Sequence, residues 1–140
     1  MSYQVSTKWV EGENFDSYID NHVVKIDTSK ERTYGPGPKK LLLTSITGCS
    51  ATDVVNILQK MRVPFEGLEV EGSAELTDGV PQVFKNIHMN FKIYGKDIKP
   101  EKVEKAIKMS IEQYCGVSFM LSKHNPVTSS FEIIATQEAI

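Results

Sequence analysis

The chain has 140 residues, enough to bury a substantial core, so we expect a single domain over residues 1–140. Its composition is globular, with 40% hydrophobic and 24% charged residues and a formal net charge of −2. The 16 lysines and arginines do not gather into one basic tract, which argues against a nucleic-acid partner. The sequence shows neither a secretory signal nor a run of about 18 apolar residues, so we expect no membrane partner and a cytoplasmic location.

The N-terminal part of the chain predicts β-strands. Residues 3–10 alternate between a polar face and a face that includes Tyr3, Val5 and Trp9, which is typical of a half-buried strand. After a polar stretch and a turn, residues 22–27 predict a second short strand. We expect these strands to begin an antiparallel sheet.

A loop rich in glycine and proline precedes a predicted long helix. Pro38 ends this loop and suits the first turn of a helix, because its missing N–H is not needed there. From residue 39 to about 61 the apolar residues fall on most sides, whereas a surface helix would show one apolar stripe. We therefore expect this helix to be central and buried.

Two further runs predict a β-hairpin. Residues 68–77 and 87–94 both alternate between apolar and polar positions, and an Asp78-Gly79 turn lies between them. The alternation predicts that each strand has one face toward the core and one face toward water.

The C-terminal part predicts two helices and a last strand. Pro100 opens an amphipathic helix that ends at Cys115, and a shorter helix runs to about residue 123. Residues 127–133 alternate as a final strand. The order of elements contains no βαβ run, which predicts the α+β class.

Cys49 and Cys115 are too few for a secreted disulfide scaffold, and a reducing cytosol does not favour a permanent cross-link. If they pair, the bond is functional. Cys49 follows Gly48 in a band of small and polar residues, and a glycine costs about 1 kcal/mol relative to alanine inside a helix. Close packing, or access to the Cys49 sulfur, explains such a glycine. The alternative is that Cys49 is a small buried hydrophobic residue.

A cysteine is a strong nucleophile only as a thiolate, which at neutral pH requires a nearby cation or hydrogen-bond donors. Arg32, Lys39 and Lys40 lie in or beside the loop that begins the long helix and are candidate cations. Asp53 lies one turn after Cys49 and is either a paired, functional charge or a solvated one. Short zinc-ligand spacings and phosphate-binding loops are absent from the sequence, so we expect neither a metal nor a cofactor.

Two segments resemble the OsmC/Ohr family of osmotically inducible and organic hydroperoxide resistance proteins. Residues 35–55, GPGPKKLLLTSITGCSATDVV, resemble the proline-to-cysteine helix of that family, and residues 110–118, SIEQYCGVS, resemble the segment around its second cysteine. The resemblance implies an α+β, OsmC-like fold with antiparallel sheets around a long central helix. It also implies an intertwined homodimer with active sites at the interface.

The resemblance implies that Cys49 is the peroxidatic cysteine and Cys115 the resolving one. Cys49 would reduce an organic hydroperoxide, become a sulfenic acid and condense with Cys115 to a disulfide, which a dithiol such as a lipoylated protein reopens. Arg32, Lys39, Lys40 and Asp53 are the candidate thiolate-stabilising residues.

The chain also departs from the family pattern. Ohr-type members carry an N-terminal arginine and a glutamate just after the helix-opening proline, whereas here two lysines follow Pro38 and the first arginine is Arg32. The sequence is therefore closest to an OsmC-like branch without that pair. The alternative function is a non-enzymatic OsmC-like dimer that binds a small hydrophobic or thiol-reactive ligand at its interface.

Overall fold

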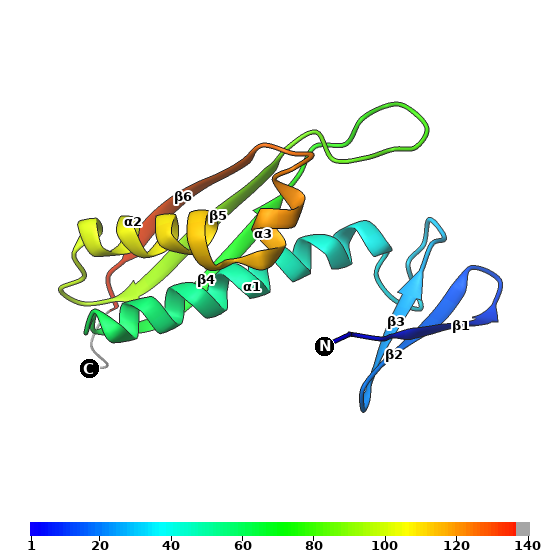
Figure 1. Ribbon diagram of the computed structural model, residues 1–140, viewed down its shortest axis with the longest axis horizontal. Helices are drawn as coiled ribbons and strands as arrows, with labels where there is room; N and C mark the ends of the chain where they lie inside the picture. The colour runs from blue at the N-terminus through cyan, green and yellow to red at the C-terminus, as the bar shows by residue number, and fades with distance from the viewer. Residues whose placement is uncertain (137–140) are drawn as a thin grey trace. The chain divides into compact units, whose positions relative to one another are not determined.

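The computed structural model describes residues 1–136, and the chain divides into two compact units, Met1–Leu42 and a second unit that begins at Leu43. The mixture of helices and strands confirms the predicted α+β class (Figure 1). The elements in chain order are β1 (Ser6–Glu11), β2 (Asn14–Ile19), β3 (His22–Asp27), α1 (Pro38–Lys60), β4 (Phe65–Ser73), β5 (Ile87–Gly95), α2 (Pro100–Met109), the π-helical turn η1 (Ser110–Tyr114), α3 (Gly116–Leu121) and β6 (Val127–Ile134).

The N-terminal unit contains a three-stranded antiparallel sheet of order β1-β2-β3. Its central strand β2 was not predicted, because its apolar residues Phe15, Tyr18 and Ile19 do not alternate. Hydrogen bonding to two neighbours compensates for that irregular pattern, since Phe15 pairs with Trp9 on one side and with Ile26 on the other.

Strand β1 is fully exposed, so the prediction of a half-buried strand over residues 3–10 is wrong for the single chain. All six residues of β1 are exposed, and 68% of Trp9 is accessible to solvent. The alternating pattern itself is present, but a sheet buries a face only where a second layer covers it. The apolar face of β1 therefore lacks a covering layer within the N-terminal unit.

The second unit contains a sheet of order β4-β5-β6. β4 and β5 are antiparallel, which confirms the predicted hairpin, although β4 begins and ends earlier than expected. β6 runs parallel to β5, which differs from the expected antiparallel arrangement. A parallel pair needs a long crossover, and here α2, η1 and α3 supply it.

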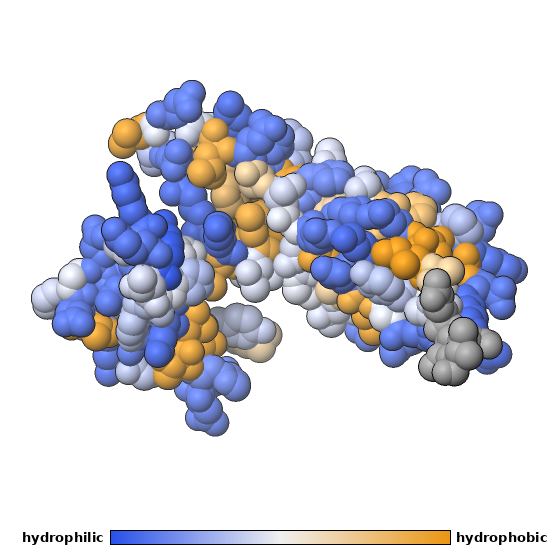
Figure 2. Space-filling view, turned by 180° about the vertical axis from the view of Figure 1, so that it is seen from behind, coloured by the Kyte–Doolittle hydropathy of each residue, from blue (hydrophilic) through white to orange (hydrophobic). Residues whose placement is uncertain are grey.

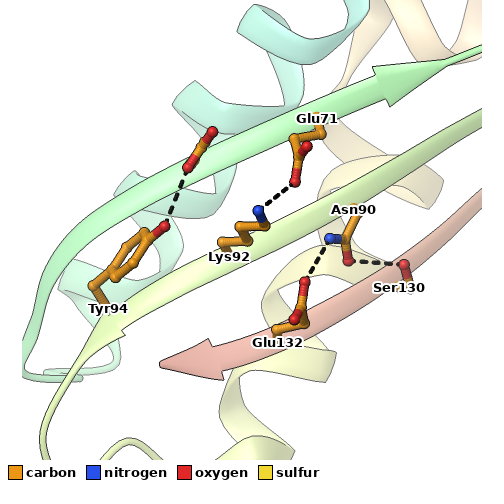
Figure 3. Close-up of polar contacts among 7 residues, drawn as sticks. Glu71, Asn90, Lys92, Tyr94, Ser130 and Glu132 are labelled. Carbon is orange, nitrogen blue, oxygen red and sulfur yellow. Dashed lines mark hydrogen bonds and ion pairs between the residues drawn. The ribbon is translucent and has the colours of Figure 1, made fainter. Parts of the chain in front are cut away.

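Helices cover one face of this second sheet (Figure 1). The other face carries polar side chains. The inward positions of β5 are completely buried, as the alternating pattern predicted. On the polar face Lys92 pairs with Glu71, and Asn90 bonds to Ser130 and Glu132 (Figure 3). The fully buried hydrophobic residues of this core are Ile46, Val54, Leu58, Ile87, Met89, Phe91, Ile93, Val103 and Ala106.

Helix α1 begins at Pro38 as predicted, but it is not buried on most sides in the single chain. Its four buried residues, Ile46, Ser50, Val54 and Leu58, follow one another at every fourth position and form one stripe. In length and apolar composition α1 would also suffice to cross a membrane, as the core helix of a globular protein can. Its remaining apolar side chains therefore stay at least partly accessible.

Candidate functional site

Helix α1 carries Cys49 near its middle, beside the buried Ser50. The hydroxyl of Thr52 donates to the carbonyl of Gly48 at 2.9 Å, and a Cβ added to Gly48 would meet nothing within 4 Å among residues 1–136. Close packing within the protomer therefore does not explain this glycine. It leaves open space on the helix surface one residue before Cys49.

Cys115 lies where helical structure is interrupted. The π-helical turn η1 ends just before it, Cys115 itself is extended with φ −78° and ψ 103°, and α3 begins at Gly116. The Cys115 N–H closes the turn by donating to the carbonyl of Ser110 at 2.7 Å. π-Helical turns often occur at functional sites, and this one sets the backbone that carries the Cys115 sulfur.

The fold brings Cys49, Asp53 and Cys115 together. One sulfur or carboxylate oxygen from each residue lies within 4.8 Å of the others. Both cysteines are free thiols; Cys115 is only 2% exposed, whereas Cys49 and Asp53 are partly exposed. Because Cys115 is distant in sequence, only tertiary structure creates this cluster, which we call the dithiol site.

The two thiols have opposite pKa shifts. Burial raises the pKa of Cys49, and its hydrogen bond to Cys115 and the charges of Cys115 and Asp53 act in the same direction. Burial also opposes ionisation of Cys115, but hydrogen bonds from Ser118, Ser50 and Cys49 outweigh it and lower the pKa of Cys115. The hydrogen bonds around Cys115 therefore favour its thiolate over that of Cys49.

Three buried serines surround the dithiol site, and the sequence analysis did not select them. The Ser50 hydroxyl donates to Cys115 Sγ at 3.4 Å, and the Ser118 N–H donates to the same sulfur at 3.3 Å. The Ser110 hydroxyl donates to Asp53 Oδ2 at 3.2 Å. Ser50 had a sequence signal, because it interrupts the apolar stripe of α1; Ser110 and Ser118 could be related to the site only by the fold.

The other predicted charged residues occupy different surroundings. The Arg32 guanidinium donates to the backbone carbonyls of Asp27 and Ser29, and it packs so close to Gly37 that a Cβ there would lie 2.9 Å from Nη2. Lys39 and Lys40 lie in the first turn of α1. Along one helix these lysines are about 15 Å before Cys49, at 1.5 Å per residue.

An open cavity of about 470 Å³ adjoins the dithiol site through Asp53. Much of its lining is apolar, from Ile57 of α1, from Met61 just after that helix, and from Met109 and Tyr114. Lys60 and Lys105 add basic groups to the same cavity. The cavity can therefore hold a small molecule with an apolar body next to Asp53.

Comparison with known proteins gives relatives over nearly the whole chain. The chain is 36% identical to the protein YhfA of Escherichia coli K12 over 134 residues, covering 94% of this chain and 98% of YhfA. A hypothetical protein from Aquifex aeolicus has 25% identity and a TM-score of 0.88, covering 98% of this chain and 99% of that chain.

The fold is also shared with a protein of named function. The organic hydroperoxide resistance protein OhrB of Bacillus subtilis has a TM-score of 0.71 at 15% identity, covering 94% of this chain and 98% of OhrB. The family model described as OsmC-like protein matches residues 28–130, which include both cysteines and the whole of α1. On this match, the chain belongs to the family of OsmC-like proteins.

Proposed function

We propose that the protein is a thiol-dependent peroxidase that reduces organic hydroperoxides through its two cysteines. The observation that carries the proposal is the dithiol site, in which two free thiols from distant parts of the chain lie within 4.8 Å. At this distance a small side-chain movement suffices to form a disulfide. Family membership and the fold shared with a hydroperoxide resistance protein point to the same peroxide-related stress function.

The proposed roles follow from accessibility and proton position. The Cys115 thiolate first accepts the proton of Cys49. Cys49, the more accessible of the two cysteines, then attacks the peroxide. The Cys49 thiolate then displaces an alkoxide, which takes that proton and leaves as an alcohol, and Cys49 becomes a sulfenic acid. Cys115 attacks this sulfur and displaces hydroxide, which takes up the proton that Cys115 released to solvent when it ionised. Two thiols and one hydroperoxide thus give a disulfide, an alcohol and water.

The cavity beside Asp53 supports an organic rather than an inorganic peroxide. Ile57, Met61 and Met109 offer apolar surface to an alkyl or aryl group, which hydrogen peroxide does not have. Asp53 is the remaining predicted site residue, and its charge raises rather than lowers the pKa of Cys49. We therefore assign Asp53 to positioning at the cavity entrance and not to thiolate stabilisation.

The proposal includes a homodimer in the cytoplasm. α1 has accessible apolar side chains, and Figure 2 shows hydrophobic surface on both units, which a second protomer would cover. Arg32, Lys39 and Lys40 remain the candidate cations for the thiolate, in the assembled dimer. A dithiol reductant, for which a lipoylated protein is the family's usual donor, would reopen the disulfide.

The decisive experiment treats reduced protein with one equivalent of cumene hydroperoxide and follows intact mass and free thiols. We expect loss of two hydrogen atoms and of both free thiols within minutes. Cys115→Ser should stop at the sulfenic acid or over-oxidise at Cys49, and Cys49→Ser should not react. If the wild type keeps both thiols, the peroxidase proposal is wrong.

A second experiment tests where the negative charge rests. Ser50→Ala removes a hydrogen bond to Cys115 Sγ and should raise the pKa of the first thiol to ionise, so disulfide formation at neutral pH slows and recovers as the pH rises. Ser122→Ala is the matched control, because the Ser122 hydroxyl bonds to the carbonyl of Phe119 instead. Equal pH profiles for the two variants would exclude Cys115 as the thiolate.

The alternative is a non-enzymatic dimer that binds a small hydrophobic or thiol-reactive ligand, and the open cavity lined by Ile57 and Met61 is the observation in its favour. The same oxidation experiment separates the two functions, since a binding protein retains its thiols with cumene hydroperoxide. An apolar fluorescent probe would then measure binding in the cavity. Its emission should change when it binds and should return to the free value when cumyl alcohol displaces it.

A further inference from the structure

The dithiol site has the donor atoms of a metal site as well as those of a redox pair. Two thiols and a carboxylate converge to within 4.8 Å, and one zinc ion would hold two thiolates about 3.8 Å apart, given Zn–S bonds of about 2.3 Å. Cys49 and Asp53 project from one face of α1, one turn apart, and Cys115 approaches from the start of α3. The ligands therefore need to close by at most about 1 Å to share a cation.

The contacts around these donors resemble the outer shell of a metal site. Ser110 donates to Asp53 Oδ2, Ser50 and the Ser118 N–H donate to Cys115 Sγ, and the Val117 N–H donates to Cys49. Such donors orient metal ligands and stabilise their charged forms. These hydrogen bonds therefore stabilise the anionic forms of the sulfurs and of the carboxylate, both on α1 and at the η1–α3 junction.

Two thiolates and a carboxylate at this distance would repel one another. Lys60 and Lys105 line the cavity beside Asp53. A divalent cation would place two positive charges at the common centre of the two sulfurs and the carboxylate.

The surroundings also leave room for a fourth ligand. Asp53 borders the cavity of about 470 Å³, which provides an entry path and a place for a metal-bound water. Ser118 is 1% exposed, and both its side chain and its backbone N–H lower the pKa of the Cys115 thiol, so it supports the sulfur ligand directly.

We propose that Cys49, Asp53 and Cys115 form a reversible site for one thiophilic divalent cation, zinc by its ligand preference, in the reduced protein. Two sulfurs with one carboxylate suit Zn²⁺ better than Mg²⁺ or Ca²⁺, which prefer oxygen ligands. Zinc binding requires both thiolates, so a bound ion occupies the same sulfurs that a disulfide would join. The cation and the disulfide therefore exclude each other, and zinc protects the reduced thiols without any change in oxidation state.

The test titrates zinc into reduced full-length protein against a chromophoric chelator and measures affinity, stoichiometry and proton release. We expect one zinc per chain, release of thiol protons, and a thiolate-to-metal charge-transfer band when Co²⁺ replaces zinc. Cys49→Ser, Cys115→Ser and Asp53→Asn should each weaken binding at least about tenfold, since loss of an outer-shell partner alone costs about that much. Asp78→Asn is the matched control on an exposed loop and should bind as the wild type does.

Specific outcomes overturn the proposal. Zinc that binds without proton release, or that binds equally well to Cys49→Ser and Asp53→Asn, would lie elsewhere on the protein. Failure of the wild type to bind one zinc per chain would show that the site does not exist. Asp53 is partly exposed, so we expect Asp53→Asn to fold. A far-ultraviolet circular dichroism spectrum equal to that of the wild type separates loss of zinc binding from unfolding. Metal binding without peroxide-driven disulfide formation would reject only the peroxidase proposal, and the reverse result would reject only the zinc site.

Discussion

The two units of this chain use the same strand pattern with opposite results. In β5 every second side chain is buried, whereas all six residues of β1 are exposed. The difference is a covering layer, because helices pack on the inner face of β5 and the N-terminal unit provides none for β1. An alternating strand thus predicts that a face will be covered, but not whether the same chain covers it.

The largest expected effect is in the core of the second unit. Ile93 on β5 is 0% exposed, and Ile93→Ala should lower the free energy of unfolding by about 2–5 kcal/mol, because it removes buried methyl groups and leaves a cavity. Ile19 at the end of β2 is 37% exposed, and Ile19→Ala should cost much less. Urea unfolding of both variants measures the contrast, and equal losses would show that Ile19 is covered in solution.

The next effect concerns what covers the N-terminal sheet. If a second protomer packs on β1, Trp9→Ala should weaken self-association by at least about tenfold, since exposed aromatic residues commonly anchor interfaces. Analytical ultracentrifugation across a dilution series measures the dissociation constant. Lys30→Ala serves as the control, because it changes an exposed residue of the same unit without removing apolar surface. Unchanged association in Trp9→Ala would place the dimer contact elsewhere.

A smaller effect should appear in acid, in the N-terminal unit. Backbone N–H groups of Ser29 and Tyr34 donate to the Asp27 carboxylate at 2.8 and 3.1 Å, and hydrogen bonding from Ser29 is the main cause of its lowered pKa. Because the pKa of Asp27 is lower in the folded protein, its ionised carboxylate stabilises the fold at pH values above the ordinary pKa of 3.8. This stabilisation is lost as the pH falls through the folded pKa.

Trp9 is the single tryptophan of the chain, so its fluorescence reports on the N-terminal sheet alone. The free energy of unfolding in urea, followed by this signal, should fall below about pH 4. Asp27→Asn should reduce this dependence on pH. Circular dichroism of the same samples reports mainly on the helices. If Asp27→Asn keeps the full acid dependence of the Trp9 signal, another carboxylate is responsible.

The smallest effect is expected on the polar face of the second sheet. Lys92 and Glu71 form an ion pair at 2.7 Å, but both side chains are solvated, and surface pairs contribute little (Figure 3). Lys92→Gln should therefore change urea unfolding less than Ile19→Ala does. A loss comparable to that of Ile93→Ala would mean that this face is covered in solution, like the inner one.

The sequence alone predicted the features that depend on local periodicity and backbone chemistry. Pro38 marked the start of α1, the alternation over residues 87–94 gave the inward face of β5, and the residues around Cys49 carried the family resemblance. These features depend on neighbours within a few positions, so the local pattern contains them.

Tertiary structure decided the rest. β2 is a strand because two neighbours pair with it, β6 is parallel because a helical crossover returns the chain, and α1 buries only the stripe that faces its own sheet. The meeting of Cys115 with Cys49 and Asp53, and the hydrogen bond from Ser50 to the Cys115 sulfur, are contacts between residues distant in sequence. Such contacts have no local period, so the sequence pattern cannot contain them.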